Sequence, residues 1–240
     1  TPMGLDFEFV AGEGPIVQSP IRTSEQVRSL RTDRTDTLNY VADAIEIVSS
    51  HFAVHPQAAL GSSIFDQLGI IGFCGAPFTL ASYMIEGGSS RNYIETKKMM
   101  YGNDSAWQIL MDKLVMVLSD FAAQQVAAGA DVIQVFDSWA GALSPTDYRQ
   151  YCLGPTTDLI RRIQAMGVPV IYFGVDTASL LPAMRETGAD VLGLDWRTPL
   201  DQAWRALNYR VAVQGNLDPI SLFAPPHTLH DRVAKILAEA

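Results

Sequence analysis

The sequence predicts an α/β fold, a (β/α)8 TIM-type barrel, on three observations. Short apolar segments of strand length alternate with segments of helical periodicity along the chain. Near-continuous apolar strands with helices between them indicate a parallel sheet that is covered on both faces. No Gly-x-Gly-x-x-Gly fingerprint or phosphate-binding loop follows a strand, and polar signatures follow several strands, which favours a barrel over a Rossmann-like sheet.

The elements are expected to begin with a hairpin over residues 7–16, which a polar helix follows. The apolar face of that helix is expected to pack in the core and carries Leu38, Val41, Ile45 and Val48. A longer helix is expected to begin near Asn103 or Asp104 and to bury Leu110, Leu114, Val117 and Phe121. Strands are expected over residues 68–73, 131–136, 168–173, 191–194 and 211–213.

Composition indicates one globular domain over residues 1–240, because 48% of its 240 residues are hydrophobic and 18% are charged. The uncharged stretch 67–85 contains glycines and a proline, which argues against a transmembrane helix. A formal net charge of −9 argues against nucleic acid or an anionic membrane as a partner. The cysteines, Cys74 and Cys152, are far apart and follow no export signal, so we expect a cytoplasmic protein without disulfides.

Residues 72–90, GFCGAPFTLASYMIEGGSS, are an apolar strand end followed by a loop rich in glycines and hydroxyls. Gly72 and Gly75 would let another backbone or a ligand approach closely, and Pro77 would end the strand. Glycines that merely turn the chain are the alternative explanation. The composition is typical of the rim of a binding site.

This stretch resembles a signature of the uroporphyrinogen decarboxylase family, and four further motifs follow in family order: MMY at 99–101, QVFDSWAG at 134–141, VLGLDW at 191–196 and VQGNLDP at 213–219. The resemblance covers essentially the whole chain. It implies a barrel enzyme that removes the carboxyl groups of the four acetate side chains of uroporphyrinogen III and yields coproporphyrinogen III. It also implies a small-molecule tetrapyrrole as partner, a homodimer, and no metal or organic cofactor.

A closed barrel needs more strands than the five that the sequence predicts, so we expect a truncated record of a longer enzyme. The resemblance places two strands before residue 1 and one after residue 240. It also places the family's catalytic aspartate, its arginine-bearing loop and a late histidine in those parts. The catalytic residue is therefore left unassigned, and we expect little activity from residues 1–240 alone.

Two residues match family positions whose hydroxyls contact the substrate or its aspartate partner, namely Tyr83 and Ser138, and both can donate a hydrogen bond. The alternatives are a tyrosine with its ring in the core and a serine that only forms a turn. Phe73 and Phe136 could present rings to a flat tetrapyrrole, with core packing as an equal alternative, and Gly75 could bring the backbone close to it.

The charged residues near these motifs are expected to have supporting roles or are given no role. A polyanionic substrate needs local cations, and the nearby ones are Arg91, Lys97, Lys98 and Arg197. Asp137 and Glu86 are expected to be supporting or structural. Asp195 and Asp218 are left unassigned, with helix capping as the local explanation for Asp218.

Two other functions are alternatives for this sequence. A corrinoid-linked or thiol methyltransferase of the same superfamily would bind zinc through His and Cys near strand ends, but neither cysteine has a histidine nearby. His51 and His55, at helical spacing, are at most a weak indication of a metal, and no metal site is expected. The second alternative is an inactive fragment that serves as a scaffold.

Overall fold

The computed structural model describes residues 1–12, 14–54 and 69–240. Its centre is a parallel sheet of five strands in the order β3-β4-β5-β6-β7, so each strand pairs with its neighbour in sequence. The sheet is not closed, because β3 and β7 do not pair with each other. The strands are β3 (Ile71–Gly75), β4 (Val132–Asp137), β5 (Val170–Gly174), β6 (Val191–Gly193) and β7 (Ala212–Gln214).

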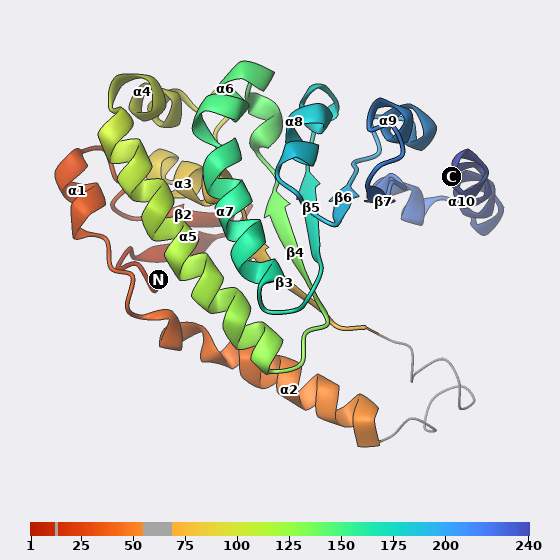
Figure 1. Ribbon diagram of the computed structural model, residues 1–240, viewed down its shortest axis with the longest axis horizontal. Helices are drawn as coiled ribbons and strands as arrows, with labels where there is room; N and C mark the ends of the chain where they lie inside the picture. The colour runs from red at the N-terminus through yellow and green to blue at the C-terminus, as the bar shows by residue number, and fades with distance from the viewer. Residues whose placement is uncertain (13, 55–68) are drawn as a thin grey trace.

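The helices cross between successive strands, as parallel pairing requires. Figure 1 shows α5 and α7 in front of the sheet, with the N-terminus near β2 and α5 and the C-terminus at the far end in α10. The α-helices are α1 (Ser24–Ser29), α2 (Asn39–Val54), α3 (Pro77–Glu86), α4 (Ile94–Gly102), α5 (Asp104–Ala127), α6 (Pro145–Tyr151), α7 (Leu153–Gln164), α8 (Leu181–Glu186), α9 (Leu200–Ala206) and α10 (Pro226–Glu239). Short 3₁₀ turns are η1 (Thr35–Leu38), η3 (Ala140–Ala142), η4 (Ala178–Leu180) and η5 (Pro219–Phe223).

The predicted alternation of apolar strands and helices is confirmed, with strand ends shifted by at most three residues. The first predicted strand began at Leu68, which lies outside the described residues. The predicted hairpin is also present, as β1 (Phe7–Val10) paired antiparallel with β2 (Gly14–Val17). The amide of Val17 donates to the carbonyl of Gly87, so the hairpin is joined to the end of α3.

Helix α5 begins where the sequence predicted. The side chain of Asn103 caps it by accepting from the amide of Ala106 at 3.2 Å. The predicted apolar face is buried: Leu110, Leu114, Val117 and Phe121. The indole of Trp107, fully buried on the same helix, donates to the carbonyl of Tyr151 at 3.0 Å. This helix therefore supplies much of the core beneath β3 and β4.

Helix α2 differs from the prediction that its whole apolar stripe packs in the core. Leu38 precedes the helix in η1 and, with Val41, lies partly buried against the core. Val48 is 44% exposed and Ile47 is 71% exposed. A helical period shows which residues share a face but not whether a second element covers the face along its length. In the described structure, only the first part of the stripe is covered.

The free edge of β3 is closed by a side chain from α5. The carboxamide of Gln125 accepts from the amide of Phe73 at 2.9 Å and donates to its carbonyl at 2.8 Å. Gly72 makes room for this contact, because a Cβ there would lie 3.0 Å from Oε1 of Gln125 and 2.6 Å from Ile133. Gln125 thus takes the place that a neighbouring strand would have at Phe73.

The segment before α2 is tied to α5 by Lys113. Its ammonium donates to the carbonyls of Val27, Arg28 and Leu30 at 3.1, 2.6 and 2.6 Å, where helix α1 ends. The last carbonyls of a helix have few amide donors, so a cation at this end of α1 is stabilising. The carbonyl of Val27 also accepts from the amide of Leu30 at 3.4 Å.

Replacing Lys113 by methionine should lower the free energy of unfolding by about 1.5–3 kcal/mol, since hydrogen bonds from a charged donor are lost while the stem keeps its length. Urea unfolding measures this loss. Lys98→Met is the control, because Lys98 is exposed and pairs with the carboxylate of Glu95, and it should cost less than about 1 kcal/mol. Equal losses in the two variants would contradict the role of Lys113.

Candidate functional site

The carboxyl end of β4 holds a buried carboxylate. Asp137 is the last residue of the strand and is fully buried. Its Oδ1 accepts from the hydroxyl of Thr79 on α3 at 2.7 Å, and its Oδ2 accepts from the hydroxyl of Tyr172 on β5 at 2.7 Å. Burial raises the pKa of Asp137, while the bonds from Thr79 and Tyr172 act in the opposite direction.

The hydroxyl of Tyr172 lies 2.9 Å from that of Tyr148 on α6. Tyr172 has a single hydroxyl proton, which it donates to Asp137, so Tyr148 is the donor in this second bond. Burial raises the pKa of both phenols well above the ordinary value, and the carboxylate of Asp137 adds to the effect. We call Thr79, Asp137, Tyr172 and Tyr148 the Asp137 network.

Thr79 also contacts the turn that follows β4. Its oxygen accepts from the amide of Trp139 at 3.2 Å, and the side chain is buried. Nearby, the amide of Ala76 donates to the carbonyl of Phe136 at 2.8 Å, which fixes the start of α3 beside the end of β4. Helix α3 and the turn at Ser138 and Trp139 therefore meet at the carboxyl end of the sheet.

Tyr83 lies on α3 and its ring stacks on that of Trp139, with the centroids 3.9 Å apart. The ring of Tyr93 adds to this group, 5.3 Å from Trp139. Burial raises the pKa of Tyr83, and burial together with the neighbouring Tyr83 and Glu86 raises that of Tyr93 to about 12. Ser138 is half-buried in the turn directly before Trp139. The structure thus brings Tyr83 and Ser138 to one end of the sheet.

The other predicted binding residues lie along one face of the sheet. Gly75 pairs in register with Phe136, and Phe136 with Phe173 on β5. The rings of Phe136 and Phe173 meet edge to face, 5.8 Å apart. Phe73 is 50% exposed and its ring lies 6.3 Å from that of Phe121.

Packing contacts surround the glycines of the first motif. A Cβ on Gly75 would lie 2.9 Å from Leu80, and the space beside Gly72 is filled by Ile133 and Gln125. Internal packing therefore explains why these two positions lack side chains. The assignment of Gly75 to substrate binding stays a prediction.

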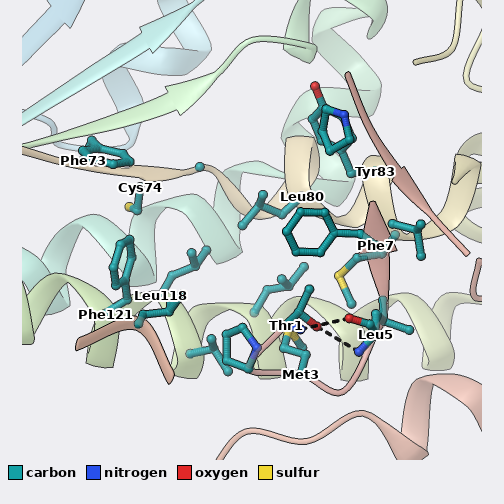
Figure 2. A pocket seen from close by; sticks show the side chains of 18 residues that line it. Thr1, Met3, Leu5, Phe7, Phe73, Cys74, Leu80, Tyr83, Leu118 and Phe121 are labelled. Carbon is teal, nitrogen blue, oxygen red and sulfur yellow. Dashed lines mark hydrogen bonds between the residues drawn. The ribbon is translucent and has the colours of Figure 1, made fainter. Parts of the chain in front are cut away.

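An apolar cavity of about 440 Å³ lies beside β3, between the N-terminal segment and helices α3 and α5. Phe73, Gly75 and Tyr83 are among the residues that line it, and its lining includes no arginine or lysine. Figure 2 shows Phe7 beside Leu80 in this cavity, while the hydroxyl of Tyr83 points away from the other labelled side chains. Because the lining contains no arginine or lysine side chain, the cavity suits apolar groups better than carboxylates.

A second buried carboxylate joins the loops at the ends of β5 and β6. Asp195 accepts from the amide of Asp176 at 2.6 Å, and its carboxylate pairs with the guanidinium of Arg197 at 2.6 Å. That guanidinium stacks over the ring of Trp196, 4.2 Å from its centroid. Asn216, after β7, donates to the carbonyl of Asp195 at 3.1 Å. The sequence had left Asp195 without a role.

The remaining candidate cations have different surroundings. Lys97 donates to the carbonyl of Ala142 at 2.7 Å, and Lys98 pairs with Glu95 at 2.8 Å. Arg91 is exposed. Lys97 thus acts as a link between α4 and the turn η3.

The carboxylates expected to be structural cap other elements. Glu86 accepts from the amide and the hydroxyl of Thr96 at 2.8 and 2.9 Å, at the start of α4. Asp218 accepts from the amide of Ile220 at 2.9 Å and caps η5, as its local explanation predicted.

Both cysteines are free and buried, and burial raises the pKa of each thiol, to about 12 for Cys74. Within the described ranges, no group of three or more His, Cys, Asp or Glu side chains could hold a metal ion. His55 lies outside those ranges. Among the helices that the structure describes, none is long and apolar enough to cross a membrane.

The sequence matches the family model described as uroporphyrinogen decarboxylase over residues 1–240. The relative of that name in Koribacter versatilis is 56% identical over 239 residues, which cover 99% of this chain and 65% of the relative. The one in Solibacter usitatus is 48% identical over 236 residues, with 98% and 65% covered. The chain therefore spans about 65% of the length of these curated relatives.

Among solved structures, a methyltransferase from Methanosarcina mazei superposes with a TM-score of 0.73 at 17% identity. The match covers 100% of this chain and 68% of that protein. At this identity the likeness shows the fold alone, which is of the TIM-barrel type.

The Asp137 network should make the free energy of unfolding depend on pH. Because burial raises the pKa of Asp137 above its ordinary 3.8, the folded protein keeps this proton to a higher pH than the unfolded chain. The stability contributed by the proton is complete below that value and is lost as pH rises through the folded pKa.

Asp137→Asn removes this titration. In chemical unfolding at a series of pH values, the stability of the wild-type protein relative to the variant should therefore fall as pH rises above about 4. A relative stability that is constant or that grows with pH would mean that the carboxyl is not held in this way.

Proposed function

The chain belongs to the uroporphyrinogen decarboxylase family, and from this membership we propose that the full-length protein converts uroporphyrinogen III to coproporphyrinogen III in porphyrin biosynthesis. The observation that carries the proposal is the family match over residues 1–240, together with 56% identity to a relative of that name. The reaction removes the carboxyl groups of four acetate side chains, so the protein would be a carboxy-lyase.

The chemistry needs little beyond positioning and electrostatics. Loss of carbon dioxide leaves an electron pair on the acetate carbon, and a pyrrole ring protonated next to the side chain can accept it. A fixed carboxylate near the ring nitrogens would stabilise that cationic ring more than the neutral substrate, which lowers the barrier. We assign no residue between 1 and 240 to this carboxylate.

We propose that the residues of this chain bind and orient the substrate. Tyr83 and Ser138 would donate hydrogen bonds from their hydroxyls at the carboxyl end of the sheet, where barrel enzymes place their functional groups. Phe73 and Phe136 would cover the apolar face of the tetrapyrrole, and Gly75 would lie beside it. Support comes from the stacking of Tyr83 on Trp139, the neighbour of Ser138.

A chain with a net charge of −9 cannot hold a polyanion by its overall field, so individual cations must do so. We propose Arg197 as one of them. Its guanidinium is held by Asp195 and Trp196, and its side chain is 44% exposed, so the remaining donors are oriented for a carboxylate. We further propose a homodimer in the cytoplasm that acts as one domain without a metal or organic cofactor.

The proposal is tested by anaerobic turnover of uroporphyrinogen III with the full-length protein, with the products identified by their number of carboxyl groups. Coproporphyrinogen III should accumulate. If no product loses a carboxyl group, the proposed function is wrong.

Tyr83→Phe and Ser138→Ala should each lower kcat/KM by about 10-fold or more, because each removes a hydrogen bond to a charged substrate. The melting temperature should hardly change, since both side chains are only half-buried. Tyr40→Phe and Ser50→Ala, on the exposed side of α2, are matched controls. Wild-type kinetics in both site variants would rule out their assignment.

A further inference from the structure

We infer that Thr79 and Asp137 act as positioning residues that hold Tyr83 and Ser138 in their working arrangement through Trp139. The inference rests on the proposed function and deepens it, because it concerns the same site. Thr79 and Asp137 are both buried, so neither is placed to touch a substrate. Their effect would reach the site only through the residues that they hold.

Asp137 sets the orientation of the Thr79 hydroxyl. The carboxylate of Asp137 can only accept at Oδ1, so the proton of Thr79 points to it, over 2.7 Å. The lone pairs of the same oxygen are then free for the amide of Trp139, at 3.2 Å. The carboxylate of Asp137 thus orients the Thr79 hydroxyl so that its oxygen can also accept from the amide of Trp139.

The spacing along α3 brings Thr79 and Tyr83 together. Thr79 and Tyr83 are four residues apart on this helix, so they lie on the same face one turn from each other. Trp139 meets both of them, with its amide on Thr79 and its ring on Tyr83 at 3.9 Å. Trp139, in the turn after β4, therefore makes two contacts with the same face of α3.

The contacts of Trp139 restrict the two residues that carry the hydroxyls of the site. Ser138 directly precedes Trp139. The hydrogen bond from the Trp139 amide to Thr79 therefore fixes the peptide group that joins Ser138 to Trp139. The stacked indole limits the ring positions of Tyr83. Loss of the Thr79 hydroxyl would release the turn and the indole together, and small displacements at a reacting centre reduce the rate strongly.

The test compares Thr79→Val with Thr79→Ser in the full-length protein. Valine keeps the shape without the hydroxyl, and we expect kcat/KM for uroporphyrinogen III to fall by about 10-fold or more, whereas serine keeps the hydroxyl and restores most of it. In the Tyr83→Phe/Ser138→Ala background, Thr79→Val should cause little further loss, because the groups that it positions are already gone. An equal fold-loss in both backgrounds would overturn the inference.

Thr187→Val is the matched control for a buried threonine. Its hydroxyl also donates once and accepts once, to Met184 at 2.6 Å and from Ala189 at 3.4 Å, but it precedes β6 at the opposite end of the sheet. It should lower the melting temperature as Thr79→Val does and leave kcat/KM unchanged. If both variants lower kcat/KM equally, the effect is one of stability and the inference is wrong.

A readout without turnover separates this inference from the proposed function. The near-ultraviolet circular dichroism of the Tyr83 and Trp139 pair is obtained by subtracting the spectrum of a Trp139→Phe variant from the spectrum of the same protein with Trp139. This difference spectrum should vanish when both proteins also carry Thr79→Val, and it should persist when both carry Thr79→Ser. A wild-type protein that does not turn over uroporphyrinogen III would refute the function alone, whereas an unchanged signal in Thr79→Val would refute the positioning role.

Discussion

The carboxylate of Asp137 is buried at the end of β4, and a buried carboxylate is stable only where donors surround it. Thr79 brings one donor from α3 and Tyr172 another from β5, so the carboxylate joins α3, β4 and β5 at the carboxyl end of the sheet. An unsatisfied partner in such a place costs about 1–3 kcal/mol or more, which makes this arrangement specific. The turn at Trp139 and the ring of Tyr83 are placed by the same contacts.

Sequence patterns predicted what depends on local periodicity. The strands and α5 appear close to their predicted positions, because buried runs and a capping Asn103 are local signals. The prediction that Val48 on α2 packs in the core was wrong, because the periodicity of one helix does not show whether a second element covers that face. Gly72 and Gly75 were singled out as places of close approach, and Ile133 and Leu80 fill the space beside them, while a contact of Gly75 with a ligand stays a prediction.

At the site, the motifs singled out Tyr83 and Ser138 and gave Asp137 a supporting or structural part, yet the phenols that contact Asp137 were missed. Tyr172 and Tyr148 lie on different elements, and only the pairing of β4 with β5 and the packing of α6 bring their hydroxyls to Asp137. The same holds for Asp195, whose partners include an amide in the loop after β5. Contacts between elements follow from tertiary packing, for which a single sequence carries no periodic signal. In the sequence, these two sites were marked only by an aspartate at or just after the end of an apolar strand, Asp137 and Asp195.

The central claim is that one carboxylate is shared by two donors from different elements. A double-mutant cycle of Thr79→Val and Tyr172→Phe, measured by the free energy of unfolding in urea, tests it most directly. Because both hydroxyls serve the same acceptor group, we predict a coupling free energy of about 0.5–3 kcal/mol between the two substitutions. Losses that add to within about 0.3 kcal/mol would show that the hydroxyls act independently and would contradict the account.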